Sequence, residues 1–497
     1  MSGRLGGILL HPTSLPGPYG IGDLGPEALD WIDWLVEAGC RLWQVLPLGP
    51  TGYGDSPYQS FSSFAGNFLL ISLDRLVEEG LLSSQDLDPR PDCPPNRVDY
   101  SLVMDYKERL LTLAMDNYHK GAARHLEDDF TSFCQAQSAW LDDFALFMAL
   151  KKAHQDAPWT AWGRTLVRRQ PEALTRAAEQ WAEEIEAQRF RQFLFFRQWS
   201  VVRQRASAAG ITIIGDIPIF AAHDSADVWA NPEVFQLDDE GEPLVVGGVP
   251  PDYFSPTGQL WGNPVYRWDV LQTEGYRWWI KRFQAVLAMV DVVRLDHFRG
   301  FEACWEIPAD APTAETGRRV PGPGASFLQA LQQALGDLPI IAEDLGFITP
   351  EVIALRDKFD LPGMKILQFA FDGNPMHEFL PHNYPRHCVT YTGTHDNDTT
   401  MGWYESAPES LRAFCRRYLG SDGIDVSWDM IRAVWASVAD WALTPLQDVL
   451  GLGSEARMNL PGTTEGNWQW RVTKGQLTQA IAAKLHDLSF IYGRLPS

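Results

Sequence analysis

Val292-Val-Arg-Leu-Asp296 is a short apolar run, broken by one arginine, that ends in a carboxylate. A buried parallel strand is expected to read as a near-continuous run of this kind, rich in Val, Ile and Leu. The pattern recurs in three other places, where short apolar runs lead to Asp216, Glu343 and Asp396. In a (β/α)8 barrel the residues that perform chemistry stand at the carboxyl ends of the strands. We therefore predict an α/β fold, a (β/α)8 (TIM) barrel with carboxylates around its mouth, over the alternative of four solvated loop carboxylates.

An alternation of strand and helix patterns runs along the 497 residues. Strands are expected where short runs are rich in β-branched residues, and helices where apolar residues recur with a period of about 3.6. The expected strands are 7–12, 41–48, 211–219, 290–296, 339–344, 364–369, 388–393 and 457–460. The expected helices include 28–38, 275–289, 326–335, one that starts at Thr349, and 475–488.

Two stretches interrupt this alternation. Residues 51–210 begin with a loop-like segment and continue as an almost wholly helical pattern, which predicts a mostly helical insertion between strands two and three. Residues 220–270 are rich in Gly, Pro and aromatic residues, which predicts a flap or loop insertion between strands three and four. With these insertions, residues 1–497 fit a single catalytic barrel domain.

The composition narrows the class of protein. Lys and Arg total 41 while Asp and Glu total 64, so the formal net charge of −23 makes nucleic acid and anionic membranes poor partners. The six cysteines contain no Cys-x-x-Cys pair and the N-terminus has no signal-peptide core, so a cytoplasmic location is expected. No stretch approaches the length of a membrane span. Aromatic residues make up 12% of the chain, and although most are expected in the core, their flat faces suit sugar rings.

Strand periodicity predicts which side chains share a face. Alternate residues point the same way, so Arg294 is expected one pleat below Asp296. A guanidinium that close favours the ionised carboxylate and lowers its pKa, as a nucleophilic Asp requires; a purely structural ion pair is the alternative. Glu343 follows an apolar run on the neighbouring strand, so its surroundings are expected to be less polar. Such a pair divides into acid and nucleophile, and a separation of roughly 5–5.5 Å suits retaining glycoside chemistry.

Other chemistries have less support in the sequence. Gly20-Ile-Gly-Asp-Leu-Gly25 has the spacing of a dinucleotide-binding loop but lacks the strand-turn-helix context, and Walker, Gly-x-Ser-x-Gly and zinc-helix motifs do not occur. His395-Asp-Asn-Asp398 is an alternative metal-binding run, since magnesium enzymes also gather acids at barrel strand ends. Arg294 would oppose a cation beside Asp296. We therefore expect no metal and no cofactor.

Longer motifs surround the acidic residues. They are Val293-Arg-Leu-Asp-His-Phe-Arg-Gly300, Ile341-Ala-Glu-Asp-Leu-Gly346 and Tyr391-Thr-Gly-Thr-His-Asp-Asn-Asp-Thr399. Further blocks are His11–Gly22, Gln44–Gly52, Asp55–Ser60, Gly215–Phe220 and Pro250–Pro264. Together these segments resemble the 4-α-glucanotransferases, also called amylomaltases or disproportionating enzymes, of the α-amylase superfamily. The resemblance covers essentially the whole chain.

The resemblance implies a retaining enzyme that cleaves an α-1,4-glucan, holds the donor as a covalent glucosyl ester and passes it to the 4-hydroxyl of another glucan or of glucose. By the same resemblance Asp296 is the nucleophile, Glu343 is the general acid and base, and Asp396 grips sugar hydroxyls and distorts the ring. The substrate-binding residues that it implies are Arg294, His395, Asp216, Ser56, Tyr58, Asp252, Tyr253, Gln259, Trp261, Asp344 and Asn467.

A flap over the acceptor side is also implied by the resemblance, around Asp252, Tyr253, Gln259 and Trp261. Closure of a flap would exclude water and favour transfer over hydrolysis. Gly247-Gly-Val-Pro-Pro251 offers a hinge, with an ordinary proline-stiffened loop as the alternative. The segment Ile217–Ala221 lacks the Asn-His pair that usually follows the strand-three Asp in the wider superfamily, which weakens an amylase or calcium-site interpretation. No C-terminal β-sandwich is expected.

Three alternatives stay open at this point. An α-1,4-glucan hydrolase would use the same carboxylates and raise the number of reducing ends. A glucan-binding protein without activity would not need Asp296, Glu343 and Asp396 together, and a metal-dependent barrel enzyme would lose activity with a chelator. Oligomeric state, chain-length preference and the choice among maltose, starch and glycogen metabolism do not follow from the sequence.

Overall fold

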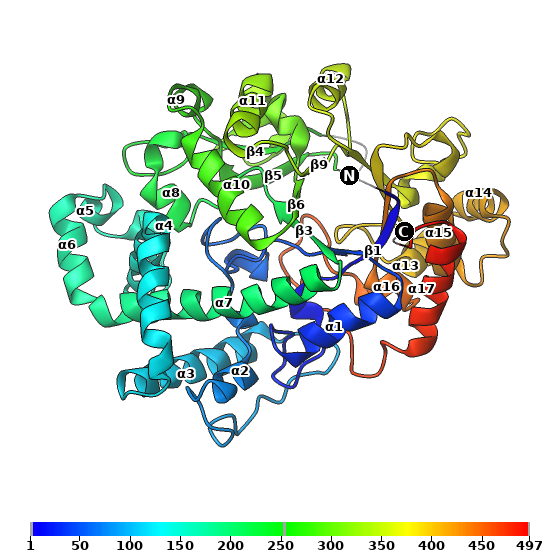
Figure 1. Cartoon of the computed structure of the whole chain (residues 1–497). Coiled ribbons are helices and arrows are strands. Elements are labelled where there is room, and N and C mark those ends of the chain that lie inside the picture. Colours follow the sequence, from blue (N-terminus) through cyan, green and yellow to red (C-terminus); the bar gives the residue numbers. More distant parts are fainter. Residues whose placement is uncertain (1–2, 252–254, 496–497) are drawn as a thin grey trace.

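Eight parallel strands form the centre of the computed structural model, which describes residues 3–251 and 255–495 (Figure 1). Their order is β10-β11-β12-β1-β2-β3-β6-β9. The strands are β1 Leu5–Leu9, β2 Leu42–Gln44, β3 Thr212–Ile217, β6 Val292–Leu295, β9 Ile340–Ala342, β10 Gly363–Ile366, β11 Cys388–Tyr391 and β12 Trp441–Pro445. The first and last strands of this order meet where the Ala342 amide donates to the Pro362 carbonyl oxygen at 2.9 Å. The predicted (β/α)8 barrel is confirmed.

The barrel interior explains why these runs fold as strands. Their inward side chains form one apolar cluster, each at most 4% exposed: Leu42, Ile214, Ile341, Met364, Ile366, Val389, Tyr391, Trp441 and Leu443. Because alternate residues of a strand share a face, Ile214 lies one pleat below Asp216 and Ile341 one pleat below Glu343. A packed apolar floor therefore supports a charged mouth at the carboxyl ends of the strands.

The eighth strand is where the sequence prediction is wrong. It is β12, Trp441–Pro445, which is buried along its whole length and pairs with β1 and β11, whereas 457–460 is an irregular segment. Trp441-Ala-Leu-Thr-Pro445 does not look like a strand because it is short and its last residue has no N–H to donate to a ladder. The side chains of Arg457 and Asn459 alternate as in a strand, but they bond to the loop after β11. The other seven predicted strands overlap observed ones.

Helices form a layer outside the strands (Figure 1). Those that follow barrel strands are α1 Pro26–Glu37, α7 Ala182–Ala208, α10 Arg277–Met289, α11 Gly324–Leu335, α12 Pro350–Lys358, α13 Thr400–Ser406, α14 Glu409–Leu419, α15 Val426–Ala436, α16 Leu446–Val449 and α17 Gln479–Ile491. In α1, Pro26 stands at the first helical position, where its missing N–H has no partner to lose. Trp31 and Leu35, four positions apart, are buried on one side. All five predicted helices overlap observed ones.

The stretch between β2 and β3 is mostly helical. Before α7 it contains α2 Leu73–Glu78, α3 Tyr100–His119, α4 Glu127–Ala153, α5 Arg164–Val167 and α6 Pro171–Gln180. Phe130 of α4 packs against Phe190 and Phe193 of α7, with ring centroids 5.4 Å apart in both pairs. Farther along α7, the Trp199 indole N–H donates to the Met289 carbonyl oxygen at the end of α10. Helix α7 therefore belongs both to the helical stretch and to the barrel wall.

A second sheet lies beside the barrel, where the sequence suggests only loops. It is antiparallel, with the order β5-β4-β7-β8, and its strands are β4 Val245–Val249, β5 Gln259–Pro264, β7 Ala303–Pro308 and β8 Arg318–Pro321. Two short helices, α8 Ala226–Ala230 and α9 Trp268–Thr273, flank the first two strands in sequence. Glycine, proline and arginine are frequent in these strands, and such compositions are typical of turns rather than of strands.

Gly247 and Gly248 lie inside β4, so the predicted hinge is wrong at these positions. A side chain added at Gly247 would reach within 2.4 Å of the Phe220 ring, and one at Gly248 within 2.1 Å of the Gln259 carbonyl oxygen. Glycine is needed here for close packing rather than for hinge motion. Across the described residues, no helix is both long and apolar enough to cross a membrane.

Candidate active site

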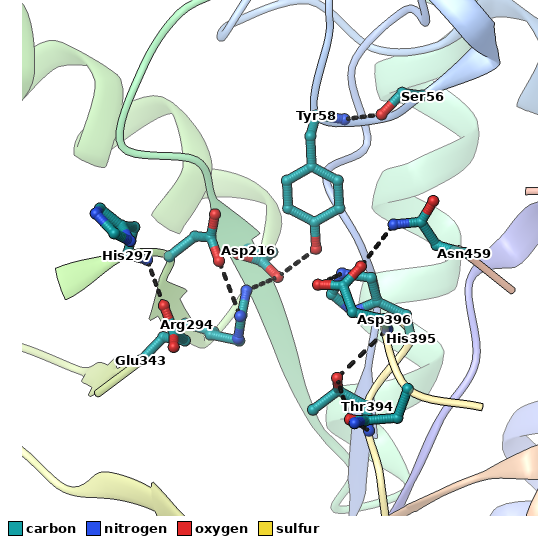
Figure 2. Close-up of polar contacts among 12 residues, drawn as sticks. Ser56, Tyr58, Asp216, Arg294, His297, Glu343, Thr394, His395, Asp396 and Asn459 are labelled. Atoms are coloured by element: carbon teal, nitrogen blue, oxygen red, sulfur yellow. Dashed lines mark hydrogen bonds and ion pairs between the residues drawn. The ribbon is translucent and has the colours of Figure 1, made fainter. Parts of the chain in front are cut away.

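Charged side chains from four strands meet at the mouth of the barrel (Figure 2). Asp216 lies in β3, Arg294 lies in β6 with Asp296 just after it, and Glu343 follows β9. His395 and Asp396 stand in the loop between β11 and α13. Parallel strands end at the same rim, so residues far apart in the sequence are brought together. The structure thus gathers the four acidic residues Asp216, Asp296, Glu343 and Asp396 at one rim.

Arg294 joins two carboxylates. One of its terminal nitrogens lies 2.7 Å from Asp216 Oδ2 and the other 2.8 Å from Asp296 Oδ1, so the contact expected from strand periodicity is present. Burial alone would lower the pKa of Arg294, but Asp216 and Asp296 hold that pKa well above its usual value. Burial raises the pKa of Asp216 to about 6, against the effect of Arg294. The Asp296 side chain is 28% exposed, so this fixed carboxylate is also accessible from the barrel mouth.

Glu343 sits in different surroundings. It is 9% exposed, and burial, reinforced by the charge of Asp296, raises the pKa of Glu343 to about 7. Its carboxylate accepts the main-chain N–H groups of His297 at 2.7 Å and Leu345 at 2.9 Å. His297 has a left-handed backbone conformation, φ 51°, in the turn directly after Asp296. The two acids at neighbouring strand ends therefore differ in polarity, as the sequence predicts.

Asp396 is held from two sides. Its Oδ1 accepts the Asn459 side-chain N–H at 2.6 Å, and its Oδ2 lies 3.3 Å from His395 Nε2. Burial would raise the pKa of Asp396, but His395 and the Asn459 hydrogen bond outweigh it and hold that pKa below its ordinary value. The Asp396 side chain is 43% exposed. It is therefore an ionised carboxylate that is open to a ligand.

Aromatic rings cover one side of this group. The Tyr58 hydroxyl donates to Asp216 Oδ2 at 2.9 Å, and its ring stacks on His395 with centroids 5.1 Å apart. Trp468 completes the set, with its centroid 5.8 Å from Tyr58 and 5.9 Å from His395. Ser56 accepts the Tyr58 main-chain N–H at 3.2 Å and so shapes the turn that carries Tyr58.

Predicted residues of the flap lie beside this cluster as far as they are described. Trp261 of β5 approaches His297 edge to face, with centroids 4.9 Å apart. Its indole N–H donates to the Gln259 side-chain oxygen at 3.1 Å. Asp252 and Tyr253 lie outside the described residues. The predicted flap therefore adjoins the turn that holds Glu343.

Two predicted residues make contacts elsewhere. Asp344 faces away from its neighbour Glu343, and its carboxylate binds Arg356 at 2.5 Å and the Met364 main-chain N–H at 2.7 Å. Asn467 accepts the Leu460 main-chain N–H at 2.9 Å and so closes the 460–467 turn. The structure gives both side chains contacts that order the chain around the site.

Other residues at the site were missed in the sequence. Asn459 and Arg457 fall in the segment 457–460 that the sequence predicts as a strand, whereas both contact Asp396 from an irregular loop. His11, just beyond β1, is 6% exposed, and burial, with a further contribution from His395, lowers the pKa of His11 to about 3. Two signals in the sequence mark His11, its position after an apolar run and its place in the His11–Gly22 block. Among the described residues, no three His, Cys, Asp or Glu side chains gather as a metal site would require.

Comparison with known proteins relates the sequence and the fold to one family. The sequence profile of glycoside hydrolase family 77, described as 4-alpha-glucanotransferase, matches residues 10–478. The chain is 54% identical to a 4-alpha-glucanotransferase of Thermus thermophilus over 99% of both chains, and 45% identical to the chloroplastic/amyloplastic one of Solanum tuberosum over 99% of this chain and 87% of the other. An amylomaltase from Streptococcus agalactiae, solved in complex with acarbose, superposes with a TM-score of 0.95 at 40% identity, over 99% of this chain and 100% of the other.

Proposed function

The chain belongs to the 4-alpha-glucanotransferase family, and we propose that Asp296, Glu343 and Asp396 carry out its glucan transfer by a retaining, two-step mechanism. The observation that supports these roles is a pair of carboxylates in unlike surroundings. Arg294 forms an ion pair with Asp296 and so supplies a counter-charge for its carboxylate, whereas burial raises the pKa of Glu343 to about 7. Near neutral pH the first is suited to attack as an anion and the second to deliver a proton.

In the first step, Asp296 attacks the anomeric carbon of the donor and the bond from that carbon to the glycosidic oxygen breaks. Glu343 gives its proton to the departing oxygen, and the donor is left as an ester of Asp296. Asp396, held by His395 and Asn459, binds sugar hydroxyls and favours a distorted ring. Tyr58 and His395 offer a flat surface for the same sugar.

In the second step, the 4-hydroxyl of an acceptor glucan, or of glucose, attacks the ester. Glu343 takes the hydroxyl proton, the ester bond breaks and Asp296 is released as an anion. Two inversions at the same carbon give net retention. Gln259 and Trp261 adjoin Glu343 through His297, which supports a flap that shelters the ester from water. The relatives described above are named as transferases, so the hydrolase alternative is not favoured.

The finer setting of the enzyme is also a proposal. We place it in the cytoplasm because its six cysteines are free. We propose maltodextrins of starch or glycogen metabolism as its substrates, because a chain with a net charge of −23 suits neutral glucans better than polyanions. Residues 51–210 would act as a helical insertion that carries Ser56 and Tyr58, and residues 220–270 as the flap insertion.

Incubation of the protein with maltotriose, without metal or nucleotide, tests the function. We expect glucose and a ladder of longer maltodextrins at a constant number of reducing ends. Rising reducing ends with only shorter products would mean hydrolysis, and no change would mean binding without catalysis. Glu343→Gln is expected to lower kcat by about 10³-fold or more. Glu306→Gln is the matched control, because Glu306 is a buried carboxylate of β7, 3% exposed. Near-normal activity of Glu343→Gln would reject the role assigned to Glu343.

A further inference from the structure

We propose that Arg457 and Asn459 form a clamp that fixes the orientation of Asp396, and that they are positioning residues for glucan transfer. The inference rests on the role proposed above for Asp396. Figure 2 shows the Asn459 amide pointing at the Asp396 carboxylate from the side opposite Arg294. The clamp comes from the segment after α16, more than sixty residues beyond the loop that it holds.

Four hydrogen bonds make up the clamp. Asn459 Nδ2 donates to Asp396 Oδ1 at 2.6 Å, and its main-chain N–H donates to the His395 carbonyl oxygen at 3.0 Å. Arg457 donates to the Asp396 carbonyl oxygen at 2.7 Å and to the Asn459 carbonyl oxygen at 2.8 Å. Both the carboxylate and the peptide of Asp396 are therefore held. The bond from Arg457 to Asn459 also links the two residues of the clamp to each other.

The clamp is anchored independently of Asp396. Met458, between its two members, is 6% exposed, and its carbonyl oxygen accepts the Trp468 N–H at 2.7 Å. Asn467 accepts the Leu460 N–H at 2.9 Å on the other side. A donor on a fixed segment orients its acceptor at little cost in conformational entropy, which is what a preorganised site requires.

The geometry leaves Asp396 usable. Asn459 binds one carboxylate oxygen and His395 lies against the other, so each oxygen keeps a lone-pair direction for a sugar hydroxyl. The plane of the carboxylate is set by two contacts on different oxygens. Misplacing such a group by about 1 Å lowers turnover by about 10²-fold, because its interactions strengthen in the transition state.

The clamp also bears on the proton affinity of Asp396. The groups that face it are His395, Arg294, Tyr58 and Arg457. Hydrogen bonds from Asn459 and His395 favour the ionised form and lower the pKa of Asp396. Without the Asn459 donor that pKa rises toward its ordinary value, so activity is lost at a higher pH as the solution is acidified. A residue that only supported the fold would not move this acidic limb.

Asn459→Asp is the decisive variant, since it keeps the shape, removes the donor and sets a carboxylate beside Asp396. We expect kcat on maltotriose to fall about 10²-fold with KM within about threefold. We also expect the acidic limb of the pH profile to move to higher pH. Arg457→Met should lower kcat about 10-fold by freeing the peptide. Asn117→Asp is the matched control, because Asn117 on α3 donates a similar amide bond to the Leu81 carbonyl oxygen, at 2.9 Å, away from the mouth.

The results separate this inference from the proposed function. An Asn459→Asp enzyme with parental kcat and an unmoved acidic limb, while Asp396→Asn is inactive, would overturn the clamp alone. A kcat loss no larger than that of Asn117→Asp at equal thermal stability would also overturn it. If Asp396→Asn kept full activity, the role of Asp396 itself would fall. A reduced kcat with a shifted acidic limb in the folded variant supports the clamp.

Discussion

Two buried arginines stand at opposite ends of the barrel and differ in what they bind. Arg294, at the carboxyl ends of the strands, contacts the carboxylates of Asp216 and Asp296. Arg494 is wholly buried near the amino ends. Among the described residues it donates only to main-chain carbonyl oxygens, those of Leu5, Val434, Trp435, Ser437, Ala439 and Asp440. Leu5 starts β1 and Asp440 precedes β12, so Arg494 fastens the strand starts to the C-terminal end.

The different partners indicate that Arg294 serves the chemistry of the site and that Arg494 serves the stability of the fold. Carboxylates beside Arg294 hold its pKa well above the usual value, whereas burial and then Arg4 lower the pKa of Arg494 to about 9. Neutral carbonyl oxygens satisfy the N–H groups of Arg494 without supplying a counter-charge. A charge network at the mouth is available for chemistry, and a hydrogen-bond hub at the base holds the fold, as expected for the two faces of a (β/α)8 barrel.

Arg294→Lys is expected to have the largest effect. A single ammonium group cannot bridge Asp216 and Asp296 as the guanidinium fork does, so the nucleophile loses its fixed position. We expect kcat on maltotriose to fall on the order of 10³-fold, about 4 kcal/mol of transition-state stabilisation. Arg386→Lys is the control, because Arg386 pairs with Asp440 at 3.1 Å while its side chain is 77% exposed. Activity within tenfold of the parent would show that the bridge is only structural.

Arg494→Met tests the other end. The methionine keeps part of the apolar packing but leaves several buried carbonyl oxygens without a donor, at a cost of about 3 kcal/mol in the free energy of unfolding. Urea unfolding measures this loss, and kcat of the folded fraction should stay within twofold of the parent. Arg432→Met on α15, where Arg432 is exposed and reaches the Tyr492 hydroxyl at 3.5 Å, should change little. A stable variant with low activity would reverse the assignment of the two ends.

The sequence predicts the mouth better than its surroundings, and the reason is physical. The period of two in β3 and β6 is enough to put Asp216, Arg294 and Asp296 on the inner face. The bond from Asn459 to Asp396 depends instead on how two loops close, and no local pattern encodes that. The strand β12 was hidden by Pro445, since its ladder is made by position in the barrel rather than by propensity.

The second sheet illustrates the same limit. β4 contains Gly247 and Gly248 because Phe220 and the β5 backbone approach closely. In the sequence alone, these glycines suggest a flexible segment, since the neighbours that require them are not known. Residues of the flap share this problem, since Trp261 meets His297 only in three dimensions. The resemblance implies a substrate-binding role for Asp344 beside Glu343, yet successive residues at a strand end face opposite ways and Asp344 binds Arg356. Motif membership therefore marks the site, and orientation decides its contacts.

The smallest predicted effect concerns the free energy of unfolding that is linked to Glu343 at the barrel mouth. Burial raises the pKa of Glu343 from its ordinary value of 4.5 to about 7, so the folded protein disfavours its ionised form. The stability linked to this group is complete below about pH 4.5 and is lost as the pH rises through about 7. Glu343→Gln has no charge to bury and should exceed the parent in unfolding free energy at pH 8 by about 1–2 kcal/mol.

That advantage should shrink toward zero at pH 4.5, where Glu343 is protonated in both the folded and the unfolded chain. Urea unfolding of the parent and of Glu343→Gln at pH 4.5, 6 and 8 measures it, with Glu306→Gln as the control. A constant difference across this range would mean that Glu343 is not held in a raised-pKa environment. A difference that grows with pH would mean that the surroundings that keep Glu343 protonated destabilise the folded protein at high pH. The hydrogen bonds of Arg494, in contrast, stabilise the fold.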